Sequence, residues 1–179
     1  MNIIFLKEGV STSLVPILTI IKNHPECIVG CILMPSEKYN KKSSEIEISP
    51  SSPIDWFYDK GSSDNTASDL LYCVEEGYSS GSMNAFLIVK EPNTLLQLNV
   101  LAVINSFNFN HSGGGGEAGK NLLKGLAQYN IRTYASPIGI PVYPDSTLLE
   151  SLTERNEAIK ARFEDVFAEL AVKWLPASW

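Results

Sequence analysis

The first part of the chain changes its hydrophobic period twice, and this pattern restricts the fold more than any other feature. The apolar run at residues 2–7 is typical of a buried strand. The next segment has Ser11 or Ser13 as an N-cap candidate, and its apolar residues follow one helical face: Leu14, Ile17, Leu18 and Ile21. Residues 27–34 then predict a second strand. Strand, helix and strand in this length predict a βαβ unit with a right-handed crossover.

Similar patterns continue to the end of the chain. Strands are predicted at residues 84–91 and 131–138, and helices at residues 67–77, 93–105 and 118–130. The clearest element is a long helix within residues 143–175, capped by Asp145 or Ser146, with one apolar side made of Leu148, Leu152, Ile159, Phe163, Val166, Phe167, Leu170 and Trp174. We expect this helix to pack across the sheet.

These elements predict an α/β fold with an open, mostly parallel, Rossmann-like sheet flanked by helices and a long C-terminal helix. A chain of 179 residues with 44% hydrophobic residues fits one domain, residues 1–179, with one core. Between about residues 36 and 66 the composition turns polar, which predicts an exposed loop with one short strand at residues 45–49.

The net charge of the chain limits the classes of molecule that it is expected to bind. A formal net charge of -6 disfavours nucleic acid and anionic membranes, because both carry negative charge themselves. The longest apolar runs fall well short of the roughly 20 residues that a membrane-spanning helix needs. Lys7 and Glu8 interrupt the apolar block that a secretory signal would need, so we expect a cytoplasmic protein. The expected partner is a small-molecule ligand. The three cysteines, Cys27, Cys31 and Cys73, are predicted to be buried structural thiols.

The stretch of residues 106–123 is the candidate site, because a histidine and four consecutive glycines follow an apolar run there. Residues 114–120 fit the phosphate-binding pattern G-x-x-x-x-G-K. However, Asn121 stands where the pattern needs Ser or Thr to hold magnesium, which disfavours nucleoside triphosphate hydrolysis. Two alternatives remain open: a non-enzymatic module that binds a phosphate-containing ligand or a protein partner through the Gly113–Lys120 loop, and an ordinary mobile loop.

A third interpretation comes from a resemblance. Residues 2–39, which contain "VPIL", resemble the opening of the formyltransferases that use 10-formyltetrahydrofolate. The segment "AFLIVKEPNTLLQLNVLAVINSFNFNHS" is similar to the later strand, helix and Asn-x-His-Pro-Ser segment of that family. Residues 140–167 resemble its closing turn and final helix. The resemblance implies transfer of a formyl group from 10-formyltetrahydrofolate to an amine.

The resemblance also implies roles for individual residues. Asn108 would hold the formyl oxygen as it gains negative charge, and His111 would assist electrostatically or by proton transfer. The ligand would also contact the surrounding turn: Asn110, Ser112, Gly113, Gly114, Gly115, Gly116 and Lys120. No metal site is expected. The segment that carries the catalytic aspartate of the family is missing between Tyr129 and Pro137, which implies a shortened domain with impaired catalysis. A carboxylate beside His111 would favour the enzyme, with Asp55, Asp59 and Glu117 as candidates.

Overall fold

The computed structural model describes residues 1–39, 46–47, 67–77, 81–91, 97–109, 113–142 and 152–175. Its elements follow one another as β1 (Asn2–Phe5), η1 (Ser11–Ser13), α1 (Leu14–Asn23), η2 (Pro25–Cys27), β2 (Ile28–Tyr39), β3 (Ile46–Glu47), α3 (Ala67–Glu75), β4 (Met83–Lys90), β5 (Leu98–Phe107), α4 (Gly114–Gln128), β6 (Thr133–Ala135), β7 (Ile140–Val142) and α5 (Leu152–Trp174). None of the described helices combines the length and the apolar character needed to cross a membrane.

The seven described strands form one open sheet in the order β1-β5-β4-β2-β3, with β6 and β7 also paired to β2. Strands β1 and β5 are parallel, as are β2 and β6, and β2 and β7. Strand β4 is antiparallel to both β5 and β2, so β1, β2, β5, β6 and β7 all run in one direction. The predicted α/β class and open sheet are therefore confirmed. The sheet is mixed: most strands run in one direction, whereas β4 in the middle and β3 run in the opposite direction.

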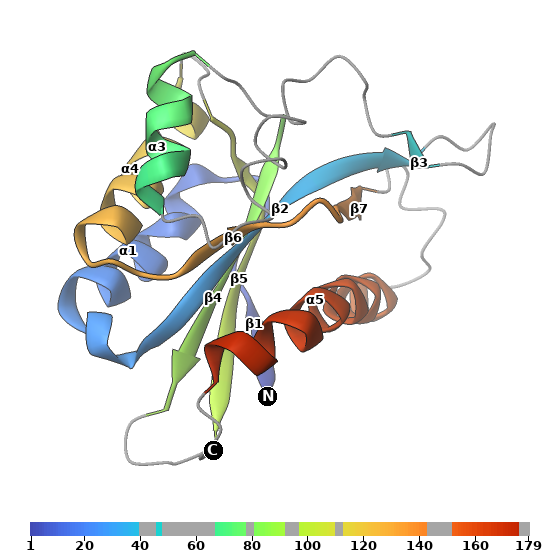
Figure 1. Cartoon of the computed structure of the whole chain (residues 1–179). Coiled ribbons are helices and arrows are strands. Elements are labelled where there is room, and N and C mark those ends of the chain that lie inside the picture. Colours follow the sequence, from blue (N-terminus) through green and yellow to red (C-terminus); the bar gives the residue numbers. More distant parts are fainter. Residues whose placement is uncertain are drawn as a thin grey trace.

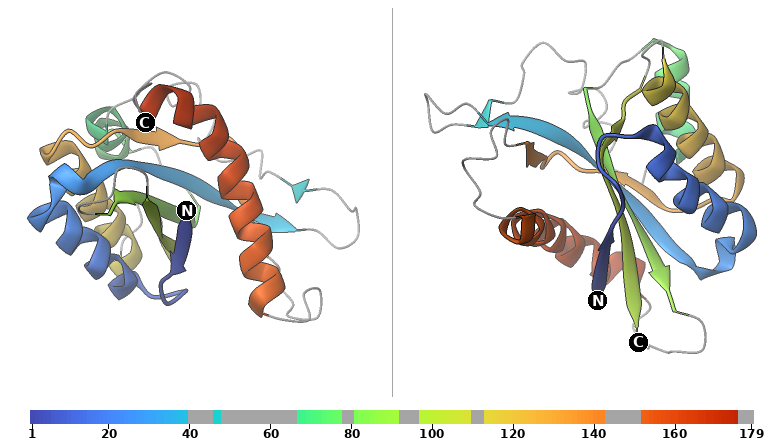
Figure 2. Two further views of the ribbon diagram at one scale, coloured as in Figure 1. Left: turned by 90° about the horizontal axis from the view of Figure 1, so that it is seen from below. Right: turned by 180° about the vertical axis from the view of Figure 1, so that it is seen from behind.

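Helices cover both faces of the sheet, as Figure 1 shows, with α1, α3 and α4 on one face and α5 on the other. The first hydrophobic core lies under α1, α3 and α4 and includes Ile17, Leu70 and Leu122. The second core lies under α5 and includes Phe86 and Phe163. Figure 2 shows α5 crossing the sheet obliquely, as predicted for the long C-terminal helix.

The main error of the sequence prediction concerns β5. The helix predicted at residues 93–105 is wrong for the described residues 97–105, most of which belong to β5. Strand β5 lies between β4 and β1. Its side chains point alternately to the two faces of the sheet, and most of them are buried on either face. A strand buried on both faces is apolar throughout, so its hydrophobic pattern is not distinct from that of a buried helix.

Smaller differences concern element ends. Strand β2 continues to Tyr39, so the first residues of the predicted 36–66 loop are part of the sheet. Within the predicted short strand at residues 45–49, β3 covers Ile46–Glu47 and pairs with β2. The Ser13 hydroxyl makes no capping hydrogen bond at α1. Leu152 is 67% exposed, in contrast to the predicted apolar side of the long helix. Strand β1 is likewise only partly covered, with Ile4 48% exposed, so the buried strand predicted at residues 2–7 is wrong. Leu148 and the proposed caps Asp145 and Ser146 lie outside the described residues.

The three cysteines are free thiols. Cys31 and Cys73 are buried, as predicted, whereas Cys27 is only half-buried. Burial raises the pKa of the Cys31 thiol to about 12, which keeps it protonated and unreactive at neutral pH. This environment supports a structural role for Cys31.

Gly30 lies directly under the indole ring of Trp174, near the C-terminal end of α5. A Cβ atom at position 30 would lie 2.8 Å from Cε3 and 2.9 Å from Cη2 of that ring, and closer still to Cζ3. The glycine therefore allows α5 to approach the sheet closely.

We expect Gly30→Ala to lower the free energy of unfolding by about 1 to 3 kcal/mol, because the indole must move out of its site. Urea unfolding measures this change. Gly81→Ala is the control, because a Cβ atom on Gly81 would have no atom within 4 Å, and its effect should stay within about 0.5 kcal/mol. Equal stabilities of the two variants would contradict the close packing of Trp174 on Gly30.

Candidate functional site

One edge of the sheet brings together the turn after β1, the end of β5 and the start of β4, with Pro35 and Ser36 of β2 beside them. Strands β1, β2 and β5 run in the same direction, and β4 runs in the opposite direction between β2 and β5. The carboxyl ends of β1 and β5 and the amino end of β4 therefore meet at this edge, and β2 passes it at Pro35 before continuing to Tyr39. Ligands of open α/β sheets bind beyond the carboxyl ends of the strands, so we expect a ligand-binding site at this edge.

Strand β5 leaves its regular pairing at this edge. Its register with β4 shifts, so that Met83 pairs with Phe107 but Ala85 pairs with Val103. Within the shift, Asn105 has a φ of 52°, in the left-handed region that asparagine tolerates better than most residues. Its N–H donates a hydrogen bond of 2.9 Å to Oδ1 of Asn84. A bulge of this kind redirects the side chains that follow it.

Asn84 is the buried hydrogen-bond partner of the bulge. Its side chain is fully buried. Besides accepting the hydrogen bond from Asn105, it donates from Nδ2 to the carbonyl oxygen of Met34 at 3.0 Å and to Oγ of Ser36 at 3.2 Å. Buried amides stabilise a structure when their polar atoms are paired, so Asn84 fixes β2, β4 and β5 relative to one another.

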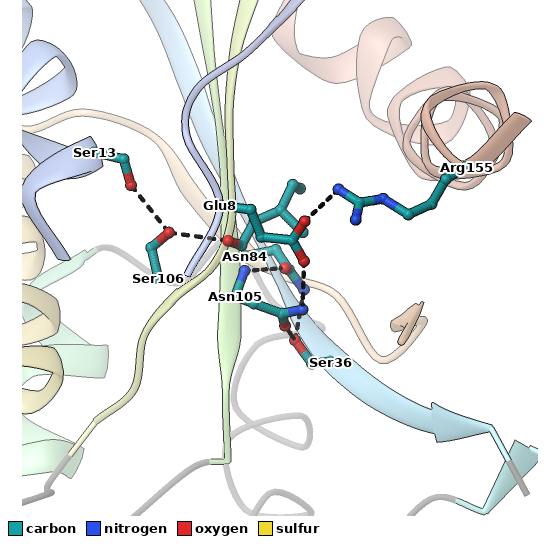
Figure 3. A network of polar contacts seen from close by, with 8 residues as sticks. Glu8, Ser13, Ser36, Asn84, Asn105, Ser106 and Arg155 are labelled. Atoms are coloured by element: carbon teal, nitrogen blue, oxygen red, sulfur yellow. Dashed lines mark hydrogen bonds and ion pairs between the residues drawn. The ribbon is translucent and has the colours of Figure 1, made fainter. Parts of the chain in front are cut away.

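The network continues to the face of the sheet that α5 covers (Figure 3). Asn105 donates from Nδ2 to Oε1 of Glu8 at 3.0 Å, and its Oδ1 accepts a hydrogen bond from the Ser36 hydroxyl. The Glu8 carboxylate also forms an ion pair with Arg155 of α5. Glu8 is thus already engaged by two neighbours on this face.

On the opposite face, a pair of buried hydroxyls joins β5 to the start of α1 (Figure 3). Ser13 and Ser106 are 7% and 5% exposed, and their hydroxyl oxygens lie 3.0 Å apart. The single proton of the Ser13 hydroxyl can be donated to Ser106 or to the carbonyl oxygen of Val10 at 2.6 Å. The Ser106 hydroxyl donates in turn to the carbonyl oxygen of Ile104 at 2.9 Å. These bonds keep the turn after β1 close to the end of β5.

A polar cavity of about 280 Å³ lies on this side of the edge. Its lining comes from the turn after β1, the start of β4, the end of β5 and the first turn of α4, and consists of Gly9, Ser11, Ser82, Asn105, Ser106, Phe107, Asn108 and Gly115. None of these lining residues carries a charge. The cavity therefore offers hydroxyl, amide and backbone groups to a ligand.

Asn108 is the residue of this cavity with spare hydrogen-bonding capacity. Its Oδ1 is buried and has no hydrogen-bond partner among the described residues. Its backbone N–H donates to the carbonyl oxygen of Gly115 at 3.3 Å, and a Cβ atom at Gly115 would lie 3.4 Å from its Nδ2. Because the amide can turn over, this position can present either an acceptor or a donor to a ligand.

The glycine run does not form the predicted loop. Gly114, Gly115 and Gly116 make the first turn of α4, and Gly113 precedes it with a φ of 141°. The whole G-x-x-x-x-G-K match at residues 114–120 is helical, so it does not form the loop that wraps phosphates in nucleotide-binding proteins. The alternative of a ligand-binding loop at Gly113–Lys120 is wrong for the same reason, because these residues form the N-cap and the first two turns of α4.

The first turn of α4 nevertheless lies at the cavity. Gly115 belongs to the lining, and a Cβ atom at Gly114 would lie 3.7 Å from Oγ of Ser11, where η1 begins. The first N–H groups of a helix have no acceptor within the helix and carry a partial positive charge. The starts of η1 and α4 thus lie side by side at this edge.

The structure brings only part of the predicted site together. Asn108 and Gly115 line the cavity, whereas Gly113, Gly114, Gly116 and Lys120 are outside its lining. Asn110, His111, Ser112, Asp55 and Asp59 lie outside the described residues. Glu117 has an exposed side chain in the first turn of α4. Among the described residues, no group of three or more His, Cys, Asp or Glu side chains could hold a metal ion.

Sequence reasoning missed the polar network around the cavity. Glu8, Ser36, Asn84 and Asn105 belong to four different parts of the chain, and only the strand register brings them together. The available signal was asparagine inside two apolar runs: Asn84 in residues 83–89, and Asn99 and Asn105 in residues 98–107. A polar residue in a buried strand needs a partner and therefore indicates a network.

Comparisons with protein-family models, with curated proteins and with solved structures find no match to this chain.

Proposed function

We propose that this chain binds a small molecule in the polar cavity, and that the group bound there is an oxyanion, a phosphate or a carboxylate. The observation that carries the proposal is a lining of hydroxyl, amide and glycine backbone groups without any charged side chain, beside the first turn of α4. The N–H groups of such a turn favour an anion, and no carboxylate of the lining would repel it.

The hydroxyls and amide of the cavity support this ligand class. Ser11, Ser82 and Asn108 all have side-chain groups that can donate hydrogen bonds. The Asn108 amide, once turned over, would donate from Nδ2 to the oxyanion. Binding of this kind needs no catalysis, so it corresponds to a ligand-binding module.

Formyl transfer from 10-formyltetrahydrofolate to an amine is the second candidate function, and the position of Asn108 favours it. The resemblance assigns the formyl oxygen to this asparagine, and its Oδ1 has no partner among the described residues. Once turned over, the amide would present Nδ2 as a donor to a formyl oxygen in the cavity. This function would also need His111 and the Rossmann-like form of the α/β sheet that the resemblance implies.

We expect inorganic phosphate to raise the thermal midpoint of the wild-type protein. At 100 times the dissociation constant, a ligand that binds only the folded state adds about 2.7 kcal/mol, which corresponds to roughly 5 to 10 °C for a chain of this size. Asn108→Asp should abolish the shift, because a carboxylate in the cavity repels an oxyanion. Titration with 5-formyltetrahydrofolate in parallel tests the second function.

Asn99→Asp is the control, because it makes the same change at the other end of β5. It should leave both responses unchanged. A response to phosphate alone supports the binding module, and a saturable folate response that Asn108→Asp removes supports formyl transfer. If neither ligand shifts the midpoint, or if both aspartate variants respond like the wild type, the two proposals are wrong.

A further inference from the structure

A second cavity, of about 310 Å³, lies at the opposite end of α4 from the polar cavity. Its lining comes from α3, α4 and α5, from the segment before β6 and from β6 itself, and it includes Leu126, Ile131, Arg132, Leu170, Lys173 and Trp174. Its volume falls at the lower end of the range for small-molecule sites in proteins.

The floor of this second cavity is apolar. Leu126 and Ile131 belong to the core under α1, α3 and α4, and Leu170 and Trp174 belong to the core under α5. The cavity therefore lies between the two helix layers, where β6 borders the sheet. All four side chains are buried in the protein, so the apolar wall of the cavity is already formed. Transfer of an apolar ligand group from water to this wall is favourable.

The polar part of the lining is positively charged. It contains Arg132 and Lys173 and no carboxylate, although the whole chain has a net charge of -6. Nη1 of Arg132 donates to the carbonyl oxygens of Lys173 at 3.3 Å and Trp174 at 3.2 Å, at the C-terminal end of α5. The structure records no acceptor among the described residues for Nη2 and Nε of Arg132. The guanidinium is therefore positioned by α5 and keeps N–H groups that can bind a ligand.

We propose that this cavity binds a small amphipathic acid, a molecule with an apolar ring or short chain and one carboxylate. The apolar part packs on Leu126 and Trp174, and the carboxylate binds Arg132 and Lys173. A planar guanidinium suits a carboxylate because it donates two parallel hydrogen bonds. The site is independent of the polar cavity and of the function proposed for it.

A neighbouring cavity of about 450 Å³ shares Asn130, Ile131, Arg132 and Trp174 with this one but is a weaker candidate. Its lining carries charges of both signs: Lys90 and Arg132 are positive, and Glu26 has a carboxyl group whose pKa is lowered by a backbone hydrogen bond, which keeps it negatively charged. That charge opposes an acid on this side of Arg132. The amphipathic acid therefore belongs in the cavity between the two cores.

The test uses phenylacetate and its neutral analogue phenylacetamide, followed through the indole N–H signals of the full chain in ¹H–¹⁵N NMR spectra. Trp174→Phe assigns the Trp174 signal. We expect phenylacetate to shift this signal saturably and phenylacetamide to bind at least several-fold more weakly. Arg132→Gln should weaken phenylacetate binding about tenfold, the effect of losing a charge-assisted hydrogen-bond pair.

Two further variants keep the test decisive if Arg132→Gln also loosens the end of α5. Ala127→Leu fills the cavity without removing a charge and should abolish the shift, whereas Lys22→Gln removes an exposed positive charge from α1 and should leave it unchanged. Circular dichroism confirms that each variant is folded. Absence of a saturable shift, equal affinity for the acid and the amide, or wild-type affinity in Ala127→Leu would overturn the proposal.

Discussion

Gly119→Ala is expected to lower the free energy of unfolding by about 3 kcal/mol or more, although alanine favours helices over glycine by about 1 kcal/mol. A Cβ atom on Gly119 would overlap the carbonyl oxygen of Asn108, and would lie 3.0 Å from Cδ1 of Phe109 and 3.2 Å from the Asn108 carbonyl carbon. Backbone atoms do not rotate away as a side chain can, so α4 and the end of β5 must separate.

Gly125→Ala is the matched control in the same helix. There a Cβ atom would meet only side-chain atoms, Cγ2 of Ile21 at 3.4 Å and Cδ2 of Leu18 at 3.9 Å. The helix preference then dominates, and we expect a change between zero and about 1 kcal/mol of added stability. Urea unfolding of both variants measures the difference. If Gly119→Ala were as stable as Gly125→Ala, α4 would not lie against Asn108 in solution.

Phe163→Ala is expected to lower the free energy of unfolding by about 3 to 5 kcal/mol, the usual range for a buried aromatic residue. Phe163 is fully buried in the core under α5. Its ring stacks on Phe86 with 4.9 Å between centroids and on Phe167 with 5.7 Å. Truncation would leave an apolar cavity between the sheet and α5, and the neighbouring rings would lose their contacts.

Val172→Ala on the same helix is the control for this second prediction. Val172 is 86% exposed, so its truncation should change the stability by no more than about 0.5 kcal/mol. Thermal or urea unfolding of the two variants gives the comparison. A small effect of Phe163→Ala would mean that α5 is not packed on Phe86, and the second core would need a different description.

Where the hydrophobic period was clear, the sequence predicted the elements well. Leu14, Ile17 and Ile21 form the buried side of α1 because a helix with one covered face needs that spacing. The same reasoning placed Ile159 and Phe163 on the buried side of α5. Strand β5 was mistaken for a helix because both of its faces are covered, so no period distinguished the two.

The candidate site was predictable only where its residues are close in the sequence. Asn108 and Gly115 belong to one stretch, and both line the polar cavity. The bulge at Asn105 and its buried partner Asn84 depend on the register between β5 and β4, and this register is a property of strand pairing across the sheet. Sequence spacing alone contains no such information.

The position of β1 has a consequence for how the chain is made. Among the described strands, β1 pairs only with β5, where Asn2 faces Asn99 and Phe5 faces Ala102. The residues between the two strands must be translated before β1 and β5 can pair, which takes roughly 5 to 20 s at ordinary rates. Contacts this distant in the sequence also slow folding. Until β5 has been made, the segment Asn2–Phe5 lacks the strand with which it pairs in the folded sheet.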